Sequence, residues 1–333
     1  MKTRITELFG IQYPIQCGGM LWIAKPELAA AISNTGAMGN LTSGNYNSAD
    51  ELRGAVDRTR ELTDKPFIVN ITTMPSIRLP VDLLRDFFRV CCEKKVVAIE
   101  IAGAPVDTFL GKEFIPMAKA AGVKVLHKVG TVKHAVHAEK VGYDAVTIAG
   151  FEEGGFPHKD NVSTIVLVPK VREAVNIPLL AAGGMADGKS LAAALALGAD
   201  GVMMATRFLA TKESGVHPNI YQVLMDKTEA DTALQLQTLL AGFGLQVRAL
   251  KNEIMAKIAR IESEGGDLSE LLPLISGERA RQVWQDGNAE EAMLTIGQSV
   301  GRISDIPAVA ELVDRMVREA EAALQGGLAA FLE

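Results

Sequence analysis

One alternation recurs through the first two thirds of the chain: an apolar, mostly β-branched run, a turn of small residues, and an Ala- or Leu-rich segment. Strands that are apolar along their whole length and alternate with helices are typical of a parallel sheet covered by helices. The pattern predicts strands at 13–17, 38–41, 67–71, 96–101, 123–128, 145–149, 178–182 and 201–205. It predicts helices between them at 26–34, 49–62, 81–94, 107–121, 132–141, 165–175 and 189–197. Eight strands within about 210 residues favour a closed TIM (β/α)8 barrel over an open sheet.

Glycine stands where several of these helices must end. Gly122, Gly142 and Gly198 each follow a helical segment and precede an apolar run. Glycine adopts the left-handed backbone conformation of a helix C-terminus without a steric penalty from Cβ. These positions therefore predict repeated helix-to-strand turns at the end of the barrel opposite its reactive face.

From about residue 217 onwards the strand-like runs stop and segments with polar faces continue to the end of the sequence. We expect helices at 219–226, 232–239, 246–261, 269–274, 279–285 and 308–324, with a loop at 263–267. The predicted organisation is an α/β barrel formed by residues 1–216 and 305–333, with a helical C-terminal lid subdomain at 217–304. The last helix would complete the ring around the barrel.

Charge and hydropathy exclude several classes of protein. The 333-residue chain has a net charge of −6 and no basic block that could follow a phosphate backbone, so no nucleic-acid partner is expected. No run of about 18 apolar residues occurs, and the N-terminus lacks an apolar signal core. We therefore expect a cytoplasmic protein, with no membrane partner, that acts on a small-molecule substrate. Association into a homodimer stays open.

Cysteine and histidine usage gives no metal or disulfide pattern. Cys17, Cys91 and Cys92 are too few for a disulfide framework, and no Cys-x-x-Cys is present. His134 and His137 are three residues apart on one predicted helix, but no third ligand candidate is near them in the sequence. No metal site is therefore expected.

Glycine is also concentrated at the C-terminal ends of the strands, where TIM barrels carry their active sites. Gly183 and Gly184 follow the seventh strand and resemble a phosphate cradle, in which backbone N–H groups face an anion. Ala205 and Thr206, after the eighth strand, could supply a second set of donors. Phosphate sites in barrels are commonly shared between these two loops. The alternative is that the glycines merely end their strands, and the paired location favours the phosphate site.

Other strand ends carry residues suited to a flat aromatic ring. Gly18 and Gly19, with Met20 beside them, could pack on the face of a flavin, or could form an ordinary tight turn. Asn70 could bond the pyrimidine edge of the ring, and its alternative is a turn-forming Asn. Lys128 could stabilise negative charge on a reduced flavin or on phosphate, and its alternative is a surface lysine. Cys17 has no cationic neighbour in the sequence, which favours a small buried residue over a nucleophile.

The segment after the sixth strand, from Gly150 through Gly155 to His158, holds two carboxylates and one histidine. His158 is a candidate general base, although a histidine in a charged loop is more often simply solvated.

Together these motifs resemble the nitronate monooxygenase, or 2-nitropropane dioxygenase, superfamily of FMN-dependent TIM barrels. That group also holds FMN-dependent enoyl-acyl-carrier-protein reductases and a bacterial NADH:quinone reductase. The resemblance covers nearly the whole chain and lies in segments 13–20 (YPIQCGGM), 65–70 (KPFIVN), 127–128 (HK), 150–155 (GFEEGG), 182–188 (AGGMADG) and 205–208 (ATRF). The tail, including 277–284 (GERARQVW), is most similar to the NADH:quinone reductase branch.

The resemblance implies roles for particular residues. It implies that FMN packs on Gly18, Gly19 and Met20, with Asn70 and Lys128 at its ring or ribityl chain. The other positions implied to bind the cofactor, several of them at its phosphate, are Gly150, Gly155, Gly183, Gly184, Ala205 and Thr206.

The chain departs from the family pattern in two places. Phe156 stands where members usually carry the histidine that serves as the base in nitronate oxidation. Phenylalanine cannot accept a proton, and Pro157 restricts how the loop could bend to bring His158 into its place. In addition, Met204, Ala205 and Thr206 stand where Gly-Thr is usual, which still leaves the backbone N–H of Ala205 available.

Three functions follow as hypotheses. The first is NADH- or NADPH-dependent reduction of a quinone or conjugated carbonyl acceptor, since hydride transfer depends on stacking geometry more than on a protein base. The second is a nitronate monooxygenase that oxidises alkyl nitronates with O2. The third is a flavin-binding protein of low turnover. Phe156 favours the first and third over the second.

Overall fold

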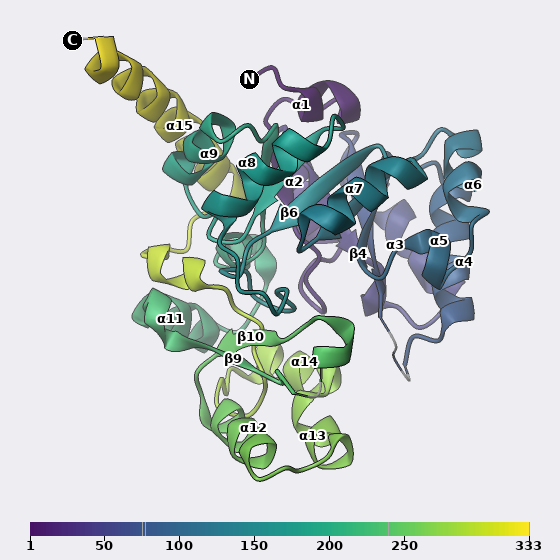
Figure 1. Cartoon of the computed structure of the whole chain (residues 1–333), viewed down its shortest axis with the longest axis vertical. Helices are drawn as coiled ribbons and strands as arrows, with labels where there is room; N and C mark the ends of the chain where they lie inside the picture. Colours follow the sequence, from purple (N-terminus) through teal and green to yellow (C-terminus); the bar gives the residue numbers. More distant parts are fainter. Residues whose placement is uncertain (75, 77, 239, 333) are drawn as a thin grey trace.

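Eight parallel strands form the centre of the structure, a computed structural model that describes residues 1–74, 76, 78–238 and 240–332 (Figure 1). They are β1 (Ile15–Cys17), β2 (Gly39–Thr42), β3 (Phe67–Thr73), β4 (Ala98–Gly103), β5 (Lys124–Val129), β6 (Ala145–Ala149), β7 (Leu179–Ala182) and β8 (Gly201–Met204). Their order is β1-β8-β7-β6-β5-β4-β3-β2, and a parallel bridge between Gln16 and Met38 connects the first strand to the second. The eight predicted strands and the TIM barrel are confirmed, with small shifts at the strand ends.

Helices surround this barrel on its outer face (Figure 1). They are α2 (Pro26–Asn34), α3 (Ala49–Leu62), α4 (Val81–Glu93), α5 (Val106–Phe109), α6 (Phe114–Ala121), α7 (Val132–Val141), α8 (Thr164–Ala174), α9 (Gly188–Ala196), α10 (Thr206–Leu209) and α15 (Val309–Leu332). The prediction of one helix over 107–121 is wrong. Gly111, with φ +147°, divides that segment into α5 and α6, because a residue in this conformation cannot continue a right-handed helix.

The predicted helix-to-strand turns are confirmed. Gly122, Gly142 and Gly198 have φ values of +74°, +101° and +97°, in the left-handed region. The last helix, α15, returns to the barrel and packs beside α9. A Cβ at Gly188 would lie 2.2 Å from the carbonyl oxygen of Met316, so only glycine allows this close approach.

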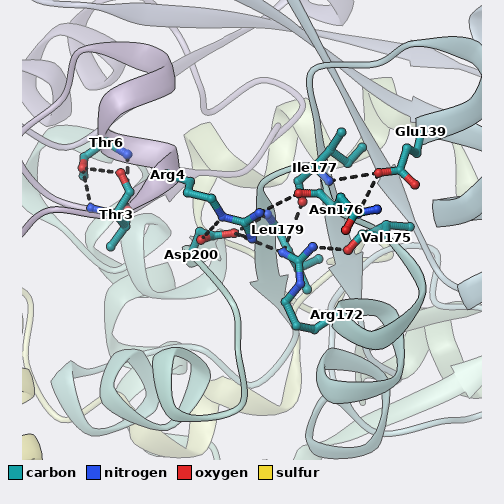
Figure 2. Close-up of polar contacts among 10 residues, drawn as sticks. All are labelled: Thr3, Arg4, Thr6, Glu139, Arg172, Val175, Asn176, Ile177, Leu179 and Asp200. Atoms are coloured by element: carbon teal, nitrogen blue, oxygen red, sulfur yellow. Dashed lines mark hydrogen bonds and ion pairs between the residues drawn. The ribbon is translucent and has the colours of Figure 1, made fainter.

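A short helix that the sequence pattern did not predict, α1 (Arg4–Phe9), closes the N-terminal end of the barrel. Its Ile5 and Phe9 form one buried cluster with Ile11 and with residues near the N-terminal ends of the strands. The strand residues and their neighbours in this cluster include Met38, Ile68, Ala98, Leu126 and Leu180. The Arg4 guanidinium donates to both carboxylate oxygens of Asp200, at 2.8 and 2.6 Å (Figure 2). Asp200 also accepts a hydrogen bond from the backbone of Leu179. With this end covered, we expect a ligand to enter from the opposite end of the barrel.

Residues 217–304 extend from that opposite end, below the barrel in Figure 1. They contain α11 (Pro218–Asp226), β9 (Thr232–Gln235), β10 (Val247–Leu250), α12 (Glu253–Ser263), α13 (Leu268–Ile275) and α14 (Gly277–Asp286). This segment, which is predicted from the sequence to be a lid and is called the lid below, has its own buried cluster, formed by Leu236, Val247, Ala249, Ile254, Met255, Ile258 and Leu271.

The prediction of a wholly helical lid is wrong in one part. Helices were expected at 232–239 and 246–261, but β9 and β10 pair there as antiparallel strands, and Leu239 lies outside the described residues. The backbone of Leu236 has φ +59°, which ends β9, and helix α12 begins only at Glu253. The two strands follow one another in the chain as an antiparallel hairpin, and their pairing overrides the local helical pattern. Within the described part of the chain, no helix is long and apolar enough to cross a membrane.

Candidate active site

A buried polar layer crosses the inside of the barrel below its open end. Asn70 on β3 and Glu100 on β4 are register partners, and the Asn70 side-chain amide donates to Glu100 Oε1 at 2.8 Å. The Gln16 amide donates to the other carboxylate oxygen. All three side chains are buried. Burial raises the pKa of Glu100 to about 7, although the Asn70 bond and the nearby Lys128 charge oppose the shift.

Glu100 therefore sets the direction of the Asn70 side chain, which lies directly against Gly19. A Cβ on Gly19 would fall 2.4 Å from Asn70 Cγ, so any other residue at this position would displace the Asn70 side chain from Glu100. The neighbouring Gly18 donates its N–H to the carbonyl of Met204 at 2.8 Å, and a Cβ there would lie 3.4 Å from Ala205 Cβ. The structure thus brings the predicted residues of the first, third and eighth strand ends into contact.

The predicted phosphate cradle has two successive left-handed glycines. Gly183 and Gly184 have φ values of +88° and +75°. Among the hydrogen bonds between described residues, none is donated by the backbone N–H groups of Gly183, Gly184 or Met185. Successive N–H groups in such a conformation form a concave site for an anion.

Neighbouring contacts hold this cradle in place. The Thr164 hydroxyl lies 2.9 Å from the carbonyl oxygen of Ala182 and 3.0 Å from that of Gly183. A Cβ on Gly150 would lie 2.2 Å from the same hydroxyl oxygen, which explains the glycine at the end of β6. Thr206 begins helix α10, and its hydroxyl accepts the N–H of Gly297 from the segment that follows the lid helices. The Thr206 hydroxyl thus bonds the segment that contains Gly297. The N–H groups without acceptors belong to Gly183 and Gly184.

Lys128 has a partner that the sequence reasoning missed. Its ammonium lies 2.6 Å from Glu153 Oε2, and the Glu153 side chain is only 8% exposed. Burial raises the pKa of Glu153, while the Lys128 charge opposes the shift. The ion pair places the Lys128 ammonium at the barrel end and ties it to the loop that follows β6.

That loop is also connected to the lid. Gly155 pairs through its backbone with Arg248 on β10, whose guanidinium donates to the Phe151 carbonyl at 2.9 Å. Phe156, next in the chain, exposes 37% of its surface. The loop therefore presents an apolar side chain where the family pattern has a histidine.

The His158 side chain contacts residues outside the group described above. Its Nδ1 lies 3.3 Å from Asp160 Oδ2, and its ring packs edge-on against the ring of His134. A Cβ on Gly130 would lie 2.7 Å from the Cβ of His158. The side chain lines a small cavity of about 200 Å³ between the loops that follow β5 and β6. Its role as a general base stays a prediction.

The three cysteines are free and buried, and burial raises the pKa of each thiol. A thiol with a raised pKa is a poor nucleophile, which agrees with the interpretation of Cys17 as a small buried residue.

The residues present fit a phosphorylated flavin. Gly19 leaves room for the Asn70 side chain, and a planar ring can approach the backbone of Gly18 and Gly19, which carries no side chain. The polar side chains of Asn70 on β3 and Lys128 on β5 can bond the edge of such a ring. An anion fits the N–H groups at Gly183 and Gly184. Sequence reasoning assigned no role to Gln16, Glu100, Glu153 or Arg248, although Gln16 and Glu153 stand in segments that it singled out. Glu100 also gave a signal, because a carboxylate in the middle of an apolar strand is rarely buried without a purpose.

Comparisons with known proteins agree with this geometry. The family model for nitronate monooxygenase matches residues 2–319. A curated relative, the (3aS,4S,5R,7aS)-5-hydroxy-7a-methyl-1-oxo-octahydro-1H-indene-4-carboxyl-CoA dehydrogenase of Rhodococcus jostii, is 35% identical, and the match covers 96% of each chain. A probable nitronate monooxygenase of Staphylococcus saprophyticus is 30% identical, over 96% of this chain and 98% of the relative. Among solved structures, FabK from Thermotoga maritima is 35% identical with a TM-score of 0.89, over 99% of each chain.

The fold, the glycine-lined barrel end and the match along nearly the whole sequence lead to one conclusion: this chain belongs to the nitronate monooxygenase family of oxidoreductases.

Proposed function

We propose that the protein binds FMN and transfers hydride between NADH or NADPH and a carbon–carbon double bond conjugated to a carbonyl group, with an acyl-CoA thioester as the substrate class. In the direction of reduction, one hydride and one proton are added across the double bond and the nicotinamide cofactor is oxidised. The name of the Rhodococcus relative, a carboxyl-CoA dehydrogenase, supports a thioester substrate.

The observation that carries the proposal is the apolar loop end at Phe156 together with the placement of His158. Phe156 cannot take up a proton, and His158 contacts Gly130, His134 and Asp160 instead of standing in its place. Nitronate oxidation that uses a loop histidine lacks its base at this position. Hydride transfer needs close stacking of the reactants and the exclusion of water. The apolar side chain of Phe156, which is partly exposed, can pack against a bound substrate and displace water from it.

The side chains around the site have separable tasks in this proposal. When bound, the flavin supplies a two-electron carrier between the two substrates. The backbone of Gly18 and Gly19, which carries no side chain, can approach the ring closely, and Gly19 also leaves room for Asn70. Asn70, oriented by Glu100, can bond the edge of the ring. Lys128, held by Glu153, provides a positive charge that stabilises developing negative charge nearby. The glycines at 183 and 184 anchor the phosphate.

An absorption experiment tests the proposal. The purified yellow protein is reduced anaerobically with NADH or NADPH, and a 2-enoyl-CoA, a quinone or an alkyl nitronate is then added. Bleaching by a reduced nicotinamide and reoxidation by the enoyl-CoA are the expected results. Reoxidation by the quinone alone would identify a quinone as the electron acceptor and overturn the assignment of a thioester substrate. Failure of both nicotinamides to bleach the flavin would overturn the proposal as a whole.

Nitronate monooxygenase is the second candidate. It is favoured by the Staphylococcus relative, which is named a probable nitronate monooxygenase and aligns along nearly the whole chain. In this case an alkyl nitronate, and neither nicotinamide cofactor, would bleach the flavin. A protein that no electron donor bleaches would be a flavin-binding protein of low turnover.

A further inference from the structure

A second cavity, of about 410 Å³, lies at the edge of the barrel where the loop after β1 meets helices α2, α3 and α14. The residues that matter for its chemistry are Trp22, Lys25, Tyr46, Glu51, Arg58 and Arg281. Small-molecule sites typically occupy about 300–1,000 Å³. The cavity is therefore large enough for one nucleotide-sized group.

The charge of the lining is unbalanced. Lys25, Arg58 and Arg281 contribute three cations, against the single carboxylate of Glu51. Arg58 is paired with both Glu61, at 3.0 Å, and Glu27, at 3.6 Å, and Arg281 lies 3.7 Å from Glu278. The exposed Lys25 forms no ion pair within the described part of the chain. Lys25 is thus the lining cation whose charge is available to attract a negatively charged ligand.

The backbone adds further donors to the same place. Helix α2 begins at Pro26, and its N-cap residue Lys25 offers no side-chain acceptor. Among the described contacts, the N–H groups of Glu27 and Leu28 in the first turn have no acceptor, as is usual for an uncapped helix. Tyr46 also lines the cavity, and its hydroxyl is buried without a hydrogen-bond partner among the described residues. The free N–H groups at the start of α2 suit the oxygen atoms of a phosphate.

An aromatic and guanidinium stack forms one wall. The Arg281 guanidinium lies 4.7 Å from the centroid of the Trp22 ring, and Arg78 lies 4.8 Å from it. The indole N–H donates to the carbonyl of Gly277 at 2.7 Å, which fixes the ring against the start of α14. A guanidinium that lies over an aromatic ring can also stack on a purine base, and its N–H groups can bond phosphate.

We propose that this cavity binds the phosphorylated adenosine diphosphate end that is common to acyl-CoA thioesters and NADPH. The inference rests on the proposed function, because it assigns the remote part of one of that reaction's two substrates. Trp22 follows Met20 by two residues, so the loop after β1 leads from the flavin site to this cavity. A ligand anchored here would extend its reactive end along that loop into the barrel.

Titration calorimetry on the flavin-loaded protein tests this proposal without turnover. The ligands are adenosine 3′,5′-bisphosphate, which represents the CoA end, and adenosine 2′,5′-bisphosphate, which represents the NADPH end. Wild type should bind one of them, and Lys25→Ala and Arg281→Ala should each weaken binding by about tenfold, the loss typical of one hydrogen bond from a charged group. Arg279→Ala, on the same helix but outside the cavity lining, is the matched control and should bind like wild type.

The preferred bisphosphate identifies the source of the ligand. Arg281→Ala also removes the contact with Trp22, so the melting temperature of this variant is measured as well. If Arg281→Ala unfolds, the test depends on Lys25→Ala, which loses no ion pair of the described chain. Binding of neither bisphosphate at millimolar concentration, or equal binding by wild type and Lys25→Ala, would overturn the inference. A protein that binds a bisphosphate but is not bleached by NADH or NADPH would refute the proposed function alone.

Discussion

Gly155 and Arg248 exchange two backbone hydrogen bonds, at 3.0 and 2.8 Å, and so connect the loop after β6 to the lid strand β10. The same loop carries Glu153, which holds the Lys128 ammonium, and Phe156. The lid is therefore joined to the residues that surround the reactive end of the barrel. A substitution in the lid at Arg248 should therefore shift the loop that carries Glu153 and Phe156.

The first prediction concerns the Arg248 side chain, which is buried and donates to the Phe151 carbonyl and to the Thr232 hydroxyl, both at 2.9 Å. Arg248→Ala should lower the free energy of unfolding by about 2 kcal/mol, because the buried Thr232 hydroxyl and the half-buried Phe151 carbonyl lose a charged donor. Urea denaturation measures the change. Arg260→Ala, on the exposed face of α12, is the control and should be neutral within about 0.5 kcal/mol. Equal stability of the two variants would contradict the structural role of Arg248.

The second prediction concerns the flavin phosphate. Gly183→Val should release most of the FMN, since Gly183 has φ +88° and a Cβ there would lie 3.0 Å from the Gly150 carbonyl oxygen. The ratio of flavin absorbance to protein absorbance after gel filtration measures retention. Gly215→Ala is the matched control, because Gly215 also has a positive φ but nothing lies within 4 Å of its Cβ position. Full flavin content in Gly183→Val would show that the phosphate is bound elsewhere.

The third prediction tests the position of the missing histidine. Phe156→His should raise nitronate oxidation by at least about tenfold, because a positioned general base typically contributes more than this. Oxygen consumption with an alkyl nitronate measures the rate, and Phe156→Leu controls for the loss of the aromatic ring. An unchanged rate in Phe156→His would mean that a base at this position does not serve the reaction.

The barrel was predictable because its signals are local. Each strand shows an apolar run, and Gly122, Gly142 and Gly198 mark the preceding turns regardless of what surrounds them. Helix α1 was missed because it is only six residues long, although Ile5, Leu8 and Phe9 have helical spacing, and because its burial depends on the strand ends that it covers. The hairpin of β9 and β10 was missed for the same reason, since its backbone partners include Gly155 in a distant loop.

In the site, strand ends were predictable and side-chain partners were not. Gly19 and Asn70 were expected near a common ligand, and they do lie in contact. That Glu100 orients Asn70, and that Glu153 holds Lys128, depends on register across the barrel and on the path of a loop. Neither of these can be derived from spacing along one sequence.

The last prediction follows from the buried carboxyl of Glu100, whose pKa is raised by burial from 4.5 to about 7. Between these two values the folded protein holds a proton that the unfolded chain has lost. Stability therefore falls as the pH rises through this window, and it levels off above about pH 7, where both states are ionised. Glu100→Gln does not titrate, so its stability relative to wild type should increase from pH 5 to pH 7 and then stay constant. Urea denaturation at pH 5, 6, 7 and 8 measures this difference, and the same difference at every pH would mean that Glu100 is already ionised in the folded barrel at pH 5.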